Sequence, residues 1–160
     1  MKKFSIFIVL FLTPFILNSL ISPVTPELLD DPSPRQDIPG SNKDLEMNVI
    51  TSVQEQSKVE IELNIKNASD SIFGYGEFFY IEKKVDGLWY MLAFDDVVFK
   101  DFSAFDNYGQ AIPPDETRTL TIDPADYALN PDSGEYRIVK AFRYHDDMKV
   151  FWLTDEFKVV

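Results

Sequence analysis

Alternation between apolar and polar side chains constrains the fold of this chain more than any other feature. In the stretch KVEIELNIK the apolar positions are Val59, Ile61, Leu63 and Ile65. Successive side chains of a β-strand point to opposite faces, so this pattern is typical of a strand with one buried face. The same alternation recurs, less regularly, from Leu45 to the C-terminus. Residues 45–160 are therefore predicted to form an all-β domain.

Turn signals divide this region into roughly seven strands, which is the number found in many β-sandwiches. We find no internal repeat, and a short helical turn is expected only at Pro124–Tyr127. The chain has no cysteine, so its apolar content of 45% must form the core without disulfides or thiolate metal sites. These features favour an antiparallel β-sandwich.

The first 22 residues have the character of an export segment. Two lysines precede an apolar run from Phe4 to Leu17, as in a secretory signal peptide. The run is also close to the length that a membrane anchor needs, although Pro14 and Asn18 weaken a permanent span. We therefore expect an extracytoplasmic protein, secreted or anchored to the membrane by residues 1–22.

Residues 23–44 form a proline-rich linker that contains half of the ten prolines of the chain. Proline removes amide donors and favours extended backbone, so this segment is predicted to be a semi-rigid, exposed spacer. The expected organisation is a signal peptide or anchor at 1–22, the linker at 23–44 and the β-sandwich domain at 45–160.

The formal net charge of −12 limits the range of partners. A surface this acidic repels the phosphate backbone of nucleic acids, so we expect no nucleic-acid binding. Docking on anionic lipid through a basic patch is excluded for the same reason, which leaves membrane contact only through the N-terminal segment.

The stretch IEKKVDGLWYML predicts a β-hairpin, because Asp86-Gly87 suits a two-residue type I′ turn. The register that follows places Val85 opposite Leu88 and Lys84 opposite Trp89. One face is then almost wholly apolar and belongs to the core. The other face carries Phe78, Tyr80, Glu82, Lys84, Trp89 and Met91.

This second face has two interpretations. In the first, the loop Val97–Tyr108 covers it and Lys84 lies over Trp89; a register slip that turns Trp89 inward belongs to the same interpretation. In the second, Phe78, Tyr80 and Trp89 form a recognition platform, because flat aromatic rings suit sugar faces and apolar peptide anchors. The expected ligand is then a protein or a cell-wall glycan.

Two stretches, YGEFFYIEKKVDGLWY and PPDETRTLTIDPADYALNPDSGEYRIVKAF, resemble a bacterial immunoglobulin-like domain family of short exported proteins and lipoproteins of Gram-positive bacteria. The similarity covers about residues 45–160. It implies an immunoglobulin-like β-sandwich with no enzymatic activity. The chain departs from the family in having PPDE where a proline-glycine turn is expected, and in lacking the lipid-attachment cysteine.

Tyr136 supports the resemblance independently. It follows Leu129, Pro131 and Gly134, a pattern typical of the corner that enters the penultimate strand of such a sandwich. There a tyrosine hydroxyl bonds back to nearby backbone. We predict this role for Tyr136.

Candidate chemistry is sparse. The one histidine, His145, lies in a predicted turn and has no nucleophile motif to serve. Acidic residues are abundant, but the loop that holds Asp95, Asp96, Asp101 and Asp106 does not match a calcium-binding loop. We predict no catalytic residues, no metal ligands and no cofactor.

The expected function is that of an exported, non-enzymatic immunoglobulin-like module, binding or structural, at the bacterial cell envelope. One alternative is a small envelope enzyme or enzyme inhibitor with its site in the acidic loops. Another is an assembly subunit whose terminal strand, MKVFWLTDEFKVV, pairs with a second chain at a sheet edge.

Overall fold

The structure, a computed structural model, describes residues 27–55, 58–93 and 109–160. The expected signal or anchor, the covering loop Val97–Tyr108 and the acidic residues from Asp95 to Asp106 all lie outside the described residues. Within the ranges given, no helix has the length and apolar character needed to cross a bilayer.

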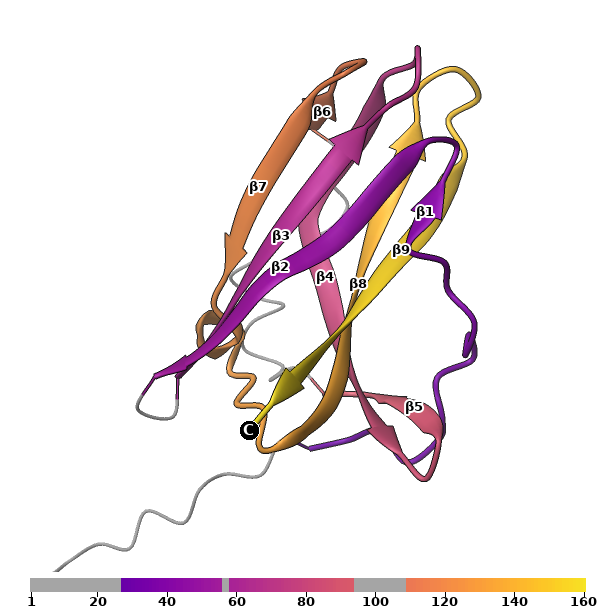
Figure 1. Ribbon diagram of the computed structural model, residues 1–160. Helices are drawn as coiled ribbons and strands as arrows, with labels where there is room; N and C mark the ends of the chain where they lie inside the picture. The colour runs from indigo at the N-terminus through magenta and orange to yellow at the C-terminus, as the bar shows by residue number, and fades with distance from the viewer. Residues whose placement is uncertain (1–26, 56–57, 94–108) are drawn as a thin grey trace, which may run out of the picture.

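Nine strands form two antiparallel sheets in the described part of the chain, packed face to face (Figure 1). The first sheet has the order β1-β2-β3-β7, with bounds Ser41–Asn42, Leu45–Glu55, Lys58–Asn67 and Thr117–Ile122. The second has the order β5-β4-β8-β9, with bounds Leu88–Met91, Phe73–Val85, Gly134–Tyr144 and Val150–Val159. Strand β6, Gln110–Ile112, pairs with the start of β4. The predicted all-β sandwich is confirmed. The count exceeds seven partly because β1 and β6, of two and three residues, are too short to show alternation.

The core lies between the two sheets and is built by the predicted alternation. On β3 the side chains of Val59, Ile61, Leu63 and Ile65 are all buried. The second sheet contributes Phe73, Phe79, Ile81, Tyr136, Ile138, Phe142 and Leu153 to the same cluster. Each such side chain stabilises the fold by about 1.5–3 kcal/mol on burial.

The β4–β5 hairpin has the predicted turn and register. Asp86 and Gly87 have φ values of +49° and +85°, the positive φ that a type I′ turn requires at both positions. Lys84 pairs with Trp89 across the hairpin. Ile81 lies in the core cluster and Trp89 on the opposite face, so the register slip is excluded.

Tyr136, near the start of β8, is the predicted corner tyrosine. Its hydroxyl donates to the backbone carbonyl of Asp132 at 2.9 Å, and it also bonds to the carboxylate of that residue. Burial and the Asp132 carboxylate raise the pKa of Tyr136. The expected short turn before this corner is present as the helix η1, Pro124–Tyr127, which is capped by the side chain of Asp123.

Replacing Tyr136 by phenylalanine removes this corner bond and keeps the ring that stacks on Phe157. We expect the free energy of unfolding to fall by about 1 kcal/mol, the net value of a typical intramolecular hydrogen bond. Urea titration followed by tryptophan fluorescence measures the change. Tyr90→Phe, on partly exposed β5, is the matched control. Equal stability of the two variants would show that the corner bond is not a stabilising contact.

Residues 27–39, which we call the strap, lie against the second sheet. Leu28 forms an antiparallel bridge with Leu92, and the Leu29 amide donates to the Met91 carbonyl at 3.0 Å. At the other end, the Thr154 amide of β9 donates to the Pro39 carbonyl at 3.1 Å. In Figure 1 the strap is the indigo trace that runs from β1 to the β4–β5 hairpin. Most side chains of residues 27–39 are exposed, as expected of the linker, but the backbone is hydrogen-bonded to the sheet and does not form a free spacer.

Candidate functional site

Two of the three residues predicted to bind ligand meet on the outer face of the second sheet. The rings of Phe78 and Tyr80, both on β4, have centroids 6.2 Å apart. Trp152 of β9 joins them, at 6.2 Å from Phe78 and 5.6 Å from Tyr80. We call these three residues the aromatic cluster. Tyr80 and Trp152 remain partly exposed.

Small side chains on β8 let the cluster form. Strand β8 runs between β4 and β9, and there Val139 pairs with Tyr80 and Ala141 pairs with Trp152. Both are buried. Burial raises the pKa of Tyr80 to about 12, with a further contribution from nearby Glu82. The Tyr80 hydroxyl is therefore neutral at physiological pH.

Sequence reasoning missed Trp152. The stretch VFWLTDEF alternates, with Phe151 and Leu153 packing in the core region and Trp152 and Thr154 on the outer face. A tryptophan on the polar side of a strand was the available signal. Its meeting with Tyr80 depends on the strand order β4-β8-β9, which no local pattern reveals.

The third predicted residue, Trp89, is not brought into the cluster. It is only 6% exposed and lies under cations, with the Arg137 guanidinium 4.7 Å and the Lys84 ammonium 5.0 Å from its ring centroid. The contact between Lys84 and Trp89 is as predicted. The strap runs over this part of the face, whereas the expected covering loop lies outside the described residues. Trp89 therefore serves the fold of the strap.

Gln36 fastens the strap to β5 by imitating a peptide group. Its carboxamide oxygen accepts from the Trp89 amide at 2.8 Å, and its nitrogen donates to the Trp89 carbonyl at 3.1 Å. The same nitrogen donates to the Ser33 carbonyl at 2.8 Å, while the Ser33 amide also donates to Trp89. Both backbone groups of Trp89 are thus satisfied along an edge that would otherwise be open.

A buried ion pair holds the strap from below. Arg137 of β8 and Glu82 of β4 form a salt bridge whose side chains are 3% and 1% exposed. The two terminal nitrogens of Arg137 donate to the backbone carbonyls of Arg35 at 2.7 Å and Gln36 at 2.6 Å. One guanidinium therefore joins the sheet to the strap.

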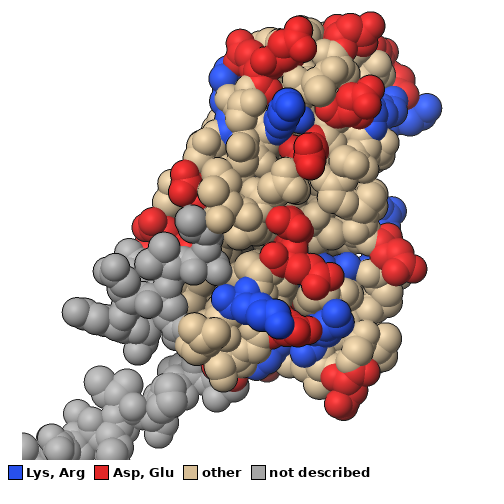
Figure 2. All heavy atoms as spheres, in the orientation of Figure 1, with Lys and Arg blue, Asp and Glu red and all other residues tan. Residues whose placement is uncertain are grey.

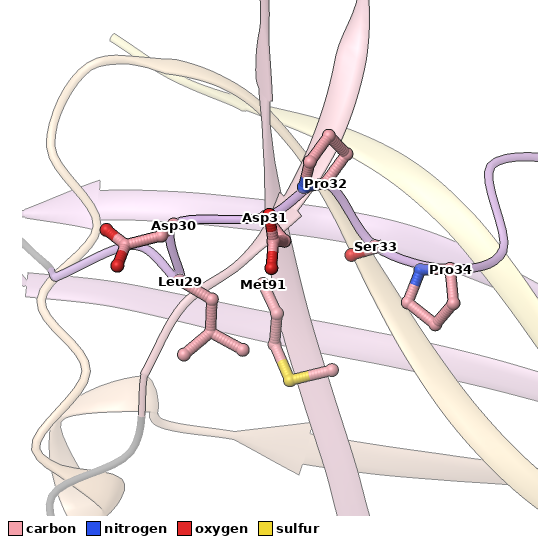
Figure 3. A pocket seen from close by; sticks show the side chains of 7 residues that line it. All are labelled: Leu29, Asp30, Asp31, Pro32, Ser33, Pro34 and Met91. Atoms are coloured by element: carbon pink, nitrogen blue, oxygen red, sulfur yellow. The ribbon is translucent and has the colours of Figure 1, made fainter.

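The strap packs less closely beside the end of β5. Figure 3 shows Leu29 and Met91 on the same side of the strap, near Pro32 and Pro34. These residues line a shallow hollow of about 360 Å³, together with Asp30, Asp31 and Ser33. The Ser33 hydroxyl is buried there without a hydrogen-bond partner. Backbone hydrogen bonds from Leu29 to Met91 and from Ala93 to Glu27 nevertheless fix this end of the strap.

Lys140 lies under the aromatic cluster, on the inner side of the same sheet. Strand β4 bulges between Tyr75 and Phe79, which leaves the carbonyls of its extra residues outside the regular ladder. The Lys140 ammonium donates to two of them, Gly76 at 2.6 Å and Phe78 at 3.2 Å. The side chain is 1% exposed, and this burial lowers the pKa of Lys140 to about 8.

The acidic residues of the β8–β9 turn, Asp146 and Asp147, are exposed together with the histidine. His145 is an exposed residue of the β8–β9 turn, as expected. A hydrogen bond from Tyr144 lowers the pKa of Asp146, and the backbone amide of Lys149 lowers that of Asp147. Figure 2 shows acidic side chains at both ends and in the middle of this face, with basic side chains next to them. These acids are therefore ionised surface groups.

Comparison with known proteins gives one family. The model of the family described as "Bacterial Ig-like domain" matches residues 41–158. No curated protein matches this chain.

The solved structures to which this chain is similar are distant. The structural genomics target SoR45 is 12% identical, with a TM-score of 0.39 over 72% of this chain and 83% of its own. The archaellum periplasmic stator protein FlaG from Sulfolobus acidocaldarius is 11% identical, with a TM-score of 0.36 over 71% of this chain and 99% of its own. A β-glucosidase from Kluyveromyces marxianus is 17% identical, with a TM-score of 0.33 over 72% of this chain and 14% of its own.

The family match covers β1 to β8 fully and β9 to within one residue of its end, and the two-sheet architecture agrees with it. The chain belongs to the bacterial Ig-like domain family.

Proposed function

We propose that this protein is an exported, non-enzymatic binding module of the bacterial cell envelope, and that its aromatic cluster contacts a neutral cell-wall glycan. Membership of the family supports a binding or structural role. The observation that carries the proposal is the pair of partly exposed rings, Tyr80 and Trp152, held 5.6 Å apart on the outer face of the second sheet.

The chemistry of these rings suits a sugar. Their faces are flat and apolar and lose little side-chain entropy on binding, so the C–H face of a pyranose ring can pack on them. The Tyr80 hydroxyl and the Trp152 indole N–H add polar groups at the rim. The net charge of −12 disfavours an anionic wall polymer, because like charges repel at close range.

The N-terminal sequence supports the location. Residues 1–22 resemble an export signal or anchor. If this segment anchors the protein, the strap begins only a few residues later and the domain sits close to the membrane, within reach of the inner wall. If the segment is cleaved, the same domain is released with its strap.

Binding to purified cell-wall sacculi tests the proposal. We expect residues 27–160 to co-sediment with sacculi in a saturable manner, and Trp152→Ala and Tyr80→Ala each to weaken binding about tenfold, as for an aromatic anchor worth roughly 1–2 kcal/mol. Ile50→Ala, which truncates a half-exposed apolar side chain on the first sheet, is the matched control and should bind as the wild type does.

Two outcomes contradict the proposal. Absence of binding to sacculi, with recovery of an envelope protein in a parallel capture experiment, would replace the glycan by a protein ligand. Undiminished binding by correctly folded Trp152→Ala would remove the aromatic cluster as the contact site.

The alternative of an envelope enzyme or inhibitor gains no support from the described residues. A general acid in a glycosidase needs a raised pKa. The acidic side chains with shifted pKa values in the described part of the chain, Asp132, Glu135, Asp146 and Asp147, are all shifted downward.

A further inference from the structure

We propose that Lys140 is a positioning residue for the aromatic cluster, and that loss of its proton loosens the β4 bulge and shifts Phe78 against Trp152. The consequence for ligand binding rests on the proposed function. The structural coupling itself does not depend on it.

The link from Lys140 to the cluster is a single residue long. The Lys140 ammonium donates to the Phe78 carbonyl on the inner side of the sheet, and the Phe78 ring lies on the outer side against Trp152. The register of β4 against β8 shifts between Tyr75 and Phe79, which marks a bulge in β4. The two bonds from Lys140 hold the backbone of this bulge, so this ammonium contributes to the position of Phe78.

Charge decides how strongly Lys140 holds the bulge. Among the described residues, the titratable groups near Lys140 are Glu77 and Tyr75 of β4 and Tyr127 of η1. The charge of Arg118 on β7 lowers the pKa of Tyr75 and partly offsets the effect of burial. Burial lowers the pKa of Lys140 more than Glu77 raises it, to about 8. Below this pH the amine is charged and its hydrogen bonds are charge-assisted. Above it the amine is neutral, and such bonds are roughly half as strong.

A spectroscopic titration tests the coupling without any ligand. The chain has two tryptophans, so Trp89→Phe leaves Trp152 as the single tryptophan whose fluorescence is observed. We expect Trp152 emission to change between about pH 6 and about pH 9.5 with a midpoint near 8, well below the range in which tyrosine titrates. In the same background, Lys140→Met should give a flat profile and Lys140→Arg, which stays charged, a flat profile at the acid-side signal.

The Lys140→Arg variant also controls for every other titratable group, because those groups are present in all the variants compared. A wild-type profile without a transition, or a transition that persists in Lys140→Arg with native circular dichroism, would overturn the coupling. If sacculi bind, we further expect affinity to fall about fivefold from pH 7 to pH 9 in the wild type alone. Failure of sacculi binding would contradict the proposed function and leave the emission result valid.

Discussion

Replacing Arg137 by methionine should lower the free energy of unfolding by about 3–5 kcal/mol, the typical cost of removing one partner of a buried ion pair. The change leaves the Glu82 carboxylate buried, with its own oxygen Oε1 already lacking a hydrogen-bond partner. It also removes both bonds from the sheet to the strap carbonyls. Equilibrium unfolding of residues 27–160 in urea measures the loss.

The double variant Glu82→Leu with Arg137→Met separates these two causes. Replacing both partners by apolar groups of similar size relieves the stranded carboxylate, so we expect about 1–3 kcal/mol of the loss to be recovered. The remaining loss in free energy of unfolding, about 2 kcal/mol, is the contribution of the two hydrogen bonds from Arg137 to the strap. A double variant as unstable as Arg137→Met alone would show that the buried charge is not the main cause.

The sandwich and its hairpin could be predicted because each depends on local chemistry. Alternation in β3 marks its buried face, and Asp86-Gly87 sets the register of the hairpin through the positive φ of both residues. The corner at Tyr136 depends on a contact with Asp132, only four residues away. Local patterns of this kind are legible in a single sequence.

The strap could not be predicted, because its contacts join distant parts of the chain. Gln36 meets Trp89 at a separation of 53 residues, and the Gln36 carbonyl meets Arg137 at 101. Its prolines suggested an exposed spacer, yet proline prevents donation by its own nitrogen only. The neighbouring amides of Leu29 and Ser33 remain free to pair with β5, and they do.

The pairing of Phe78 with Tyr80 in the candidate site could be predicted for the same reason. Phe78 and Tyr80 are two residues apart on one strand, so they share a face wherever that strand lies. Trp89 was assigned to the correct face of the hairpin, but the strap that buries it comes from another part of the chain. The contribution of Trp152 could not be predicted without the strand order, in which β8 lies between β4 and β9 and places the small side chains of Val139 and Ala141 between the rings.

Removing the strap should destabilise the domain by about 4 kcal/mol. A fragment of residues 41–160 retains the region matched by the family model but exposes Trp89, worth roughly 2 kcal/mol when buried, and loses two hydrogen bonds from Arg137 to the strap, worth about 1 kcal/mol each. Comparison of its urea midpoint with that of residues 27–160 measures the effect. We expect the shorter fragment to have a lower midpoint and a tryptophan emission shifted to the red.

A graded variant keeps this prediction testable if the shorter fragment fails to fold. Gln36→Ala removes the surrogate peptide group and should cost about 2 kcal/mol, because it strips the Trp89 amide and carbonyl of one partner each. Amide hydrogen exchange at Trp89 should then accelerate, whereas Gln110→Ala, at an exposed position on β6, should leave it unchanged. If exchange at Trp89 stays slow in Gln36→Ala, some other contact protects this edge.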